Sequence, residues 1–162
     1  MSEDNSGYWK ILEPIWYDDD LNSEAPEIYL KRFQELTEAQ QVLFPTHWFY
    51  SEINNGGFHQ CFYNATGRFA PEAVLGFKKL GLVETAEVVQ KAIDIFEKPF
   101  PRDPGKYLDF LDSFVGETRE EWDPFYRLDN EFYSSFRIEG AKIWEDDKFL
   151  IAADEFAKTM IS

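Results

Sequence analysis

The segment that decides the fold runs from residue 48 to residue 64 and reads Trp48-Phe49-Tyr50-Ser51-Glu52-Ile53-Asn54-Asn55-Gly56-Gly57-Phe58-His59-Gln60-Cys61-Phe62-Tyr63-Asn64. Aromatic residues lie on both sides of Asn-Asn-Gly-Gly, and Asn and Gly tolerate the left-handed backbone that ends helices and turns chains. We therefore predict a helix, a sharp corner and a second helix, with aromatic side chains meeting across the corner in the core. The architectural residues of this corner are predicted to be Asn54, Asn55, Gly56, Gly57 and Phe58: the Asn amides bind its backbone groups, the glycines permit the turn and Phe58 anchors it.

The size and composition of the chain are those of one globular domain. Its 162 residues can bury a real core without disulfides or a structural metal, and 16 Phe, 8 Tyr and 5 Trp supply the apolar area. Cys61 is the only cysteine, which suits a reducing compartment. The N-terminus, Met1-Ser2-Glu3-Asp4-Asn5, is polar and acidic where a signal peptide is basic and then apolar, and no run of about 18 apolar residues occurs. We expect one domain over residues 1–162, soluble in the cytoplasm and without a membrane partner.

Apolar residues recur at helical spacing through the rest of the chain, with Pro, Gly and capping residues at the boundaries. Helices are predicted over about residues 7–17, from Pro26 to Leu36, from Thr37 to the corner, from Phe58 to Asn64, from Pro71 to Leu80, over 83–96, from Tyr107 to Gly116, from a cap at Asp123 onward, and from about 141 or later to Met160. No segment has the clean alternation of a strand. The fold class is therefore predicted to be all-α, a single compact domain of about seven to nine helices.

The apolar residues of each predicted helix are expected to face the core. Ile28 is expected to face inward from the second helix together with Tyr29, Phe33 and Leu36. Val115 is expected to face inward near the end of the helix that closes at Gly116.

The net charge of −15 lies at the two ends of the chain. Residues 1–40 hold ten acids and three bases, a net −7, and residues 103–162 hold fifteen acids and seven bases, a net −8. Residues 41–102 hold six of each and are neutral. The acidity thus flanks a neutral, aromatic centre.

Most catalytic and cofactor-binding patterns are missing. His47, His59 and Cys61 are the only His and Cys residues, but they lack the paired short spacings of a zinc site, and Cys61 shares an apolar stripe with Phe58 and Phe62, which favours an inert buried thiol over a Cys-His nucleophile. A calcium loop starting at Asp18 would need Gly where Ser23 stands and Glu where Tyr29 stands. No phosphate-binding glycine motif or basic nucleic-acid patch occurs, and no carboxylate pair stands out for acid–base catalysis. We expect no metal, no cofactor, no direct nucleic-acid binding and no enzymatic activity.

The acids themselves are the remaining functional signal. Glu117, Glu120 and Glu121 stand at i, i+3 and i+4, which places like charges about 5–6 Å apart on a helix and destabilises it mildly. One interpretation is an ordinary solvated face. The other is an imitation of the phosphate array of duplex DNA, on whose scale a net charge of −15 equals about 25 Å of duplex.

The run Glu52-Ile53-Asn54-Asn55-Gly56-Gly57-Phe58-His59-Gln60-Cys61-Phe62-Tyr63-Asn64-Ala65-Thr66-Gly67 resembles a family of small bacterial helical proteins. The motif of that family reads approximately Glu-x-Asn-Asn-Gly-Gly-Phe-x-Gln-x-Phe-x-Asn-x-x-Gly, and the close match covers about residues 47–82. The described representative of the family is an acidic DNA mimic, similar in size and charge, which forms dimers. It occupies the DNA-binding face of a helix-turn-helix transcription factor and so relieves repression. The resemblance therefore implies a homodimeric, non-enzymatic regulator whose partner is a DNA-binding protein.

The family motif contains only one acid, Glu52, so the partner-binding residues are chosen by clustering. They are Asp18, Asp19, Asp20, Glu117, Glu120, Glu121, Asp123, Glu145, Asp146 and Asp147. The main alternative is an enzyme or small-ligand protein that uses the corner from Asn54 to Tyr63, with His59 and Tyr63 as its chemical groups. A third interpretation is an acidic module for a basic partner that does not bind DNA.

Overall fold

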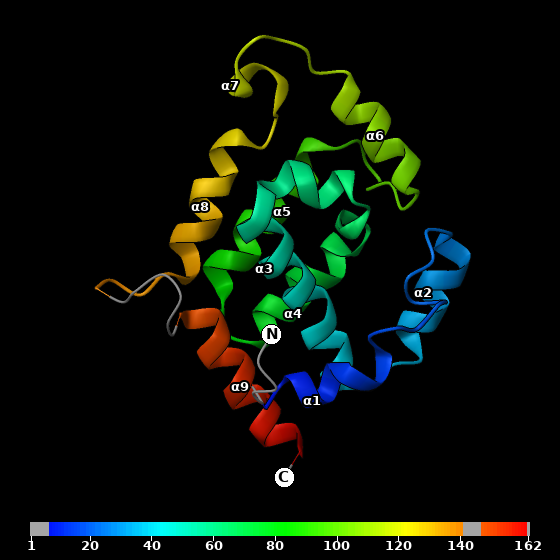
Figure 1. Cartoon of the computed structure of the whole chain (residues 1–162), viewed down its shortest axis with the longest axis vertical. Helices are drawn as coiled ribbons and strands as arrows, with labels where there is room; N and C mark the ends of the chain where they lie inside the picture. The colour runs from blue at the N-terminus through cyan, green and yellow to red at the C-terminus, as the bar shows by residue number, and fades with distance from the viewer. Residues whose placement is uncertain (1–6, 141–146, 162) are drawn as a thin grey trace.

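Helix α3 (Glu38–Tyr63) runs through the middle of the molecule, and α1, α4, α6, α8 and α9 all contact it (Figure 1). The structure is a computed structural model that describes residues 7–140 and 147–161. Within those residues the chain forms helices only, as predicted, packed into a single compact domain. The other α-helices are α1 (Trp9–Leu12), α2 (Pro26–Gln34), α4 (Ala70–Lys79), α5 (Val83–Ile95), α6 (Pro104–Asp112), α7 (Arg119–Trp122), α8 (Tyr126–Phe136) and α9 (Lys148–Ile161), with 3₁₀ helices η1 (Glu13–Ile15) and η2 (Thr66–Phe69).

Helix α3 begins at the predicted capping box. The hydroxyl of Thr37 accepts a hydrogen bond from the backbone N–H of Gln40 at 3.2 Å, and the side chain of Gln40 accepts one from the N–H of Thr37 at 3.1 Å. These two bonds satisfy backbone donors that a helix N-terminus otherwise leaves without partners.

The predicted corner is a kink within α3, and the two glycines alone make it. Gly56 (φ −151°, ψ 16°) and Gly57 (φ 78°, ψ −179°) leave the helical conformation. Asn54 and Asn55 instead remain in the helical turn before the kink, with exposed side chains. A backbone with the φ and ψ of Gly57 is open essentially to glycine alone, because a Cβ there meets the neighbouring carbonyl oxygens.

Aromatic side chains fill the space on the inner side of the kink, as the sequence predicted. Phe58 is fully buried, and its ring centroid lies 5.9 Å from that of Phe125 and 5.5 Å from that of Phe132. Phe62, one turn further, stacks on Phe125 at 5.1 Å. The kink therefore turns the second half of α3 into the aromatic core, which joins it to α8.

The predicted helix over residues 7–17 is shorter in the structure. It consists of α1 and the 3₁₀ turn η1, because Pro14 has no backbone N–H to donate and its ring collides with the preceding helical turn. Tyr17, which follows, is 89% exposed. Ile28 of α2 is also exposed, so the expected inward orientation of this residue was wrong, whereas Tyr29 beside it is fully buried.

The region between α6 and α8 also differs from the prediction. Helix α6 ends at Asp112 and not at Gly116, and Val115 lies on the following loop with 82% of its surface exposed. The short helix α7 was not predicted. Asp123 accepts a hydrogen bond from the N–H of Phe125 in the turn before α8, so the helix starts at Tyr126, three residues after its predicted cap.

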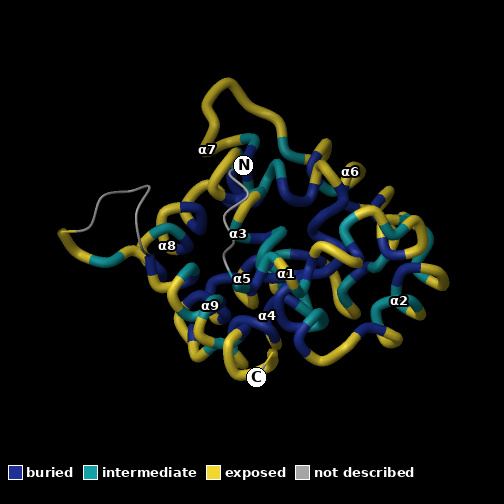
Figure 2. Tube along the Cα trace, turned by 60° about the horizontal axis from the view of Figure 1, so that its bottom comes forward, coloured by how far each residue is buried: buried dark blue, intermediate teal, exposed yellow. Residues whose placement is uncertain are grey.

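The burial pattern separates a covered centre from an exposed outer segment. Figure 2 shows the loop between α6 and α7 exposed along most of its length, while buried and partly covered residues make up most of α3. In the part of the chain that the structure describes, no helix is long and apolar enough to span a membrane.

We predict that Gly57→Ala lowers the free energy of unfolding by about 3 kcal/mol, because its Cβ would be strained by the backbone and would also lie 2.4 Å from the carboxylate of Asp129. The matched control is Gly81→Ala, since Gly81 has the same sign of φ (79°) and open space around the position of a Cβ. It should cost about 1 kcal/mol. Urea unfolding followed by circular dichroism measures both, and equal losses in the two variants would refute the role of Gly57.

Candidate partner-binding surface

The structure divides the predicted contact acids into exposed and buried groups. Asp19, Asp20, Glu117, Glu120 and Glu121 are exposed. Asp18 is partly covered, and Asp123 and Asp147 are buried, with 1% and 7% of their surfaces exposed. Glu145 and Asp146 lie outside the described residues. The side chains of Asp123 and Asp147 therefore cannot present charge to a partner, and their inclusion in the contact set was wrong.

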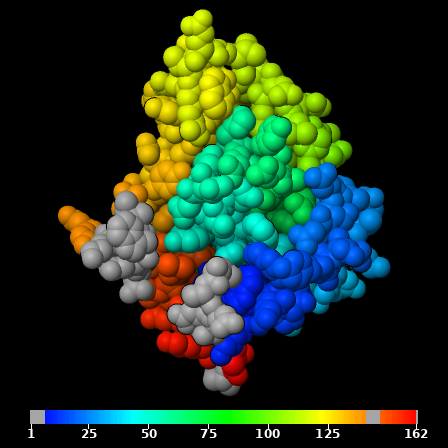
Figure 3. All heavy atoms as spheres, in the orientation of Figure 1, coloured from blue at the N-terminus to red at the C-terminus, as the bar shows by residue number. Residues whose placement is uncertain are grey.

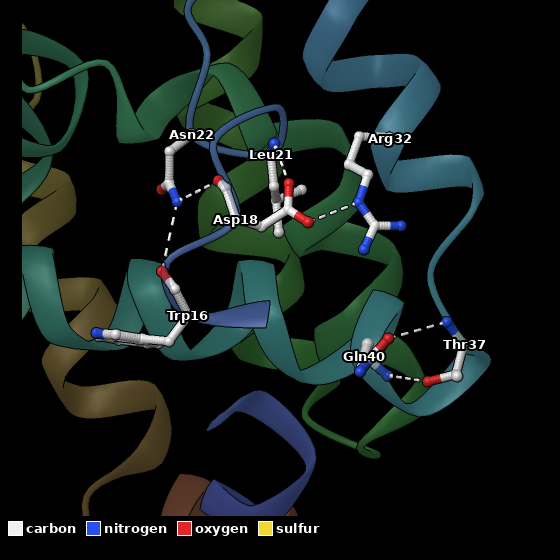
Figure 4. Close-up of polar contacts among 7 residues, drawn as sticks. All are labelled: Trp16, Asp18, Leu21, Asn22, Arg32, Thr37 and Gln40. Atoms are coloured by element: carbon white, nitrogen blue, oxygen red, sulfur yellow. Dashed lines mark hydrogen bonds and ion pairs between the residues drawn. The ribbon is translucent and has the colours of Figure 1, made fainter. Parts of the chain in front are cut away.

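Asp18 organises the loop that contains the other two aspartates (Figure 4). One carboxylate oxygen accepts a hydrogen bond from the N–H of Leu21 at 2.8 Å, and the other pairs with Nε of Arg32 at 2.8 Å. Burial works against the charged form, but these two hydrogen bonds outweigh it and hold the pKa of Asp18 below its ordinary value. The amide of Asn22 donates to the carbonyl oxygens of Asp18 and Trp16, which closes the loop. The charge of Asp18 therefore stabilises the loop and is not free to contact a partner.

The buried Asp123 and Asp129 both face the guanidinium of Arg119, whose side chain is about half exposed. The guanidinium of Arg119 lies 3.2 Å from the carboxylate of Asp123 and 3.7 Å from that of Asp129. Asp129 in turn accepts the backbone N–H of Phe58 at 2.9 Å, immediately after the kink. A carboxylate from α8, and not an Asn amide as predicted, therefore binds the backbone of the corner.

The environment of Asp129 favours its protonated form. Burial is the main cause that raises the pKa of Asp129 to about 6; the nearby charge of Asp123 acts in the same direction, while the Phe58 hydrogen bond and Arg119 oppose the shift. Gly57 permits the close approach that this contact needs, since a Cβ at that position would overlap the carboxylate.

Asp147 is committed to the start of α9. One of its oxygens accepts the N–H of Leu150 at 2.8 Å, and the other accepts a short hydrogen bond from the hydroxyl of Tyr50. Asp147 is therefore a capping residue that also joins α9 to α3.

Exposed acids gather instead along α6, α7 and the loop between them. We define the acidic edge as the exposed acids of this segment together with those of the loop before α2: Asp19, Asp20, Glu24, Asp103, Asp109, Asp112, Glu117, Glu120 and Glu121. The contributions of Asp103, Asp109 and Asp112 were not predicted. The signal was present in the sequence, since Asp109 and Asp112 stand three residues apart on the helix whose opposite face carries Tyr107 and Leu111.

The bases of the same segment are engaged with other groups. Arg119 turns toward Asp123 and Asp129, and Lys106 lies 3.8 Å from Glu97. Arg127 of α8 pairs with Glu120 at 2.8 Å. Among the described residues no ion pair involves Asp109, Asp112 or Glu117, so these charges are left on the surface.

The loop before α2 and the start of α6, which are far apart in the sequence, lie next to each other. The hydroxyl of Tyr29 in α2 donates to the carbonyl oxygen of Arg102 at 2.8 Å, just before α6 begins. Figures 1 and 3 accordingly show the loop before α2 and the start of α6 side by side, with α7 further along the same edge. The fold thus brings the loop that carries Asp19 and Asp20 next to the acidic α6–α7 segment.

Glu52, the one acid of the family-like motif, has an internal role. Its carboxylate accepts hydrogen bonds from the side chains of Gln60 at 2.9 Å, Asn64 at 3.3 Å and Thr66 at 3.4 Å. These residues follow the kink, whereas Glu52 precedes it. The carboxylate therefore joins the two halves of α3. This role could not be inferred from the sequence, because Glu52 and its partners are 8 to 14 residues apart.

The chemical groups of the alternative enzyme or ligand site, His59 and Tyr63, stack on each other with ring centroids 6.5 Å apart but do not line a pocket at the corner as that hypothesis requires. A surface hollow of about 610 Å³ lies at the corner, lined by Tyr8, His47, Tyr50, Ser51, Glu52, Asn54, Asn55, Gln60 and Asn64. His59 packs instead against Trp122 of α7, with ring centroids 5.2 Å apart, and Tyr63 is 61% exposed on the surface. The two residues expected to carry the chemistry therefore do not line this hollow.

The other candidate chemical groups are packed into the structure. Burial lowers the pKa of His47 to about 4, and its ring lies against the rings of Tyr8, Trp9, Trp16 and Trp48. Cys61 is fully buried, and burial raises the pKa of its thiol. The described part of the chain holds no group of three or more side chains placed to bind a metal ion.

Comparison with known proteins finds one family. The family model described as DMP19-like protein matches residues 34–152, which include the kinked helix and the helices from α4 to α8. No curated protein and no solved structure gives a significant match.

We predict that Asp129→Asn becomes more stable relative to the wild type as pH rises from 4 to 7. The folded-state pKa of Asp129 is about 6, above the ordinary value of an aspartate, so the folded wild type binds more protons than the unfolded chain in this window and loses stability as pH rises. The Asn variant lacks this loss while its carbonyl still accepts the N–H of Phe58. Urea unfolding at a series of pH values measures the difference.

The control for this prediction is Asp112→Asn, which removes an exposed carboxylate from α6. Its stability difference from the wild type should change little over the same pH range. If the Asp129→Asn difference is equally flat, burial does not shift the titration of Asp129 as stated.

Proposed function

We propose that this chain, which belongs to the DMP19-like protein family, acts as a DNA mimic. In this proposal its acidic edge occupies the DNA-binding face of a bacterial transcription factor. The partner in this proposal is a helix-turn-helix protein, and its release from operator DNA relieves repression. No catalytic step is part of the function.

The observation that carries the proposal is the placement of the charges. The bases of the α6–α7 segment, Lys106 and Arg119, are paired with carboxylates, while the exposed Asp109, Asp112 and Glu117 make no ion pair with any described residue. Solubility alone does not require neighbouring segments whose exposed acids lack paired bases. A surface that competes with DNA does, because the duplex presents closely spaced negative charges to its binding proteins.

The placement also gives the surface a defined shape. Asp18 fixes the loop of Asp19 and Asp20 through Leu21 and Arg32, and Trp122 and Arg119 fix α7 against α3 and α8. Charges on such anchored segments are held ready for a partner, which lowers the entropy cost of association.

The most direct test is capture of partners from a bacterial lysate on the immobilised chain, followed by elution with duplex DNA. A DNA-binding protein that duplex DNA displaces supports mimicry. A partner that resists displacement by duplex DNA indicates an acidic module for some other basic protein and contradicts the proposal.

The acidic edge is then tested with the purified partner and two charge-matched variants. Asp109→Asn/Asp112→Asn/Glu117→Gln neutralises three acids of the edge, and Glu84→Gln/Glu87→Gln/Asp94→Asn neutralises three exposed acids of α5. We expect the edge variant to raise the Kd about tenfold, a change of about 1.4 kcal/mol, and to weaken its dependence on salt. The α5 variant should bind nearly as the wild type does, and equal effects of the two variants would show that net charge alone matters.

A homodimer is also part of the proposal. Sedimentation equilibrium at micromolar concentration should give about twice the 19.1 kDa mass of the chain. A mass that stays at 19.1 kDa at these concentrations contradicts the dimer without bearing on the acidic edge.

A further inference from the structure

A second hollow, smaller than the one at the corner, lies between the loop before α2, the middle of α3 and η2. Its volume is about 230 Å³, and its lining includes Asn22, Glu24, Phe44, Trp48, Asn64 and Arg68. One wall is aromatic, while the others carry amide, carboxylate and guanidinium groups. The residues that line it play no part in the proposed DNA mimicry, apart from Glu24 at the acidic edge.

Arg68 is an unusual member of this lining, because it is a buried cation without a carboxylate partner. It is 7% exposed, and no ion pair in the described part of the chain involves it. Its guanidinium donates to the carbonyl oxygens of Ala65 at 2.7 Å and Leu21 at 3.2 Å, while its Nε is buried without a hydrogen-bond partner. Buried charges in proteins are normally paired, since desolvation of an unpaired ion is costly.

Aromatic rings hold this guanidinium in place. Its central carbon lies 4.7 Å from the ring centroid of Phe69 and 5.2 Å from that of Tyr29. These contacts and the two carbonyl bonds keep the cation at the hollow even though burial acts to lower the pKa of Arg68.

A negative group belongs to the same hollow without touching the cation. Glu24 is exposed on the loop before α2, and its charge acts on the pKa of Arg68, yet the two side chains do not come within ion-pair distance. Glu52 also lines the hollow, with its carboxylate already bound by Gln60, Asn64 and Thr66. A cation and an anion thus lie apart on the lining of one small hollow.

We propose that this hollow binds a free α-amino acid, with the ligand carboxylate on Arg68, its ammonium group toward Glu24 and its side chain against Phe44 and Trp48. A guanidinium matches a carboxylate with two parallel N–H donors, which would satisfy the unpaired charge of Arg68. The aromatic wall suits an apolar side chain.

Size and charge exclude other small molecules. The volume of about 230 Å³ equals that of about eight waters, which accommodates an amino acid and is too small for a nucleotide. A simple anion is repelled by the two glutamates and by the net charge of −15, and a simple amine, although attracted by these charges, leaves Arg68 without a carboxylate partner. A zwitterion has no net charge and matches both groups.

Isothermal titration calorimetry on the full chain tests the proposal, first with each of the twenty standard amino acids. At least one with an apolar side chain should bind saturably, and leucine serves as the example. 4-Methylpentanoate lacks the ammonium group of leucine and 3-methylbutylamine lacks the carboxylate, so each should bind at least tenfold more weakly. The absence of saturable binding of every amino acid at millimolar concentration, or equal binding of the carboxylate analogue, would overturn the proposal.

The location of the binding site is tested by substitutions at two exposed residues, which do not disturb the core. Glu24→Gln should weaken amino-acid binding at least tenfold, whereas Glu27→Gln on α2, which does not line the hollow, should leave it unchanged. Equal binding by the two variants refutes the placement of the ammonium group. None of these results depends on capture of a DNA-binding protein, so this proposal and the proposed function fail independently.

Discussion

The fold depends on one close contact, in which the carboxylate of Asp129 reaches the backbone at Gly57 and accepts the N–H of Phe58 at 2.9 Å. A helix kink leaves backbone donors without partners, and a buried donor must find another acceptor. Here the acceptor comes from α8, 71 residues further along the chain, so it fixes the corner and docks α8 in the same step. Glu52 completes the arrangement by tying the first half of α3 to Gln60 and Asn64 in the second.

The net charge of the chain does not show which of its acids present their charge at the surface and which use it inside the molecule. Asp18, Asp123, Asp129 and Asp147 serve as acceptors for backbone N–H groups, so their negative charge is used inside the molecule or close to it. Arg119 is used in the same way, because its guanidinium faces Asp123 and Asp129. Because Arg119 pairs with these two carboxylates, the exposed acids of the α6–α7 segment are left with less compensating positive charge. The cluster of Asp123, Asp129 and Arg119 therefore affects both the fold and the charge of the α6–α7 surface.

Much of the fold could be predicted from local sequence signals. The capping box at Thr37, the prolines in the first turns of α2 and α4, and the glycines at the kink each act on neighbouring residues, so their effects can be inferred without knowledge of the rest of the structure. The end of the helix after Tyr107 could not be placed from periodicity, because Val115 continues the apolar pattern but finds nothing to pack against. Helix α7 has only four residues, too few for a periodic pattern to show.

The candidate site was harder to predict for a physical reason. An aspartate in a string of acids looks the same whether it faces water or accepts a distant backbone N–H, and only tertiary packing decides which. Asp123 was therefore chosen with Glu120 and Glu121 although it lies inside, while Asp109 and Asp112 were passed over although they lie on the surface. The proposed mimicry then depends on the exposed acids of the acidic edge, and the buried acids hold the segments that carry them in place.

A double-mutant cycle between Gly57 and Asp129 measures the contact on which this arrangement depends. Gly57→Ala should cost at least about 1 kcal/mol less in an Asp129→Ala background than in the wild type, because the carboxylate that the new Cβ would meet is then gone. The remaining cost should be that of the strained backbone alone. If Gly57→Ala costs the same in both backgrounds, the glycine does not serve the approach of Asp129, and another interaction must hold the kink.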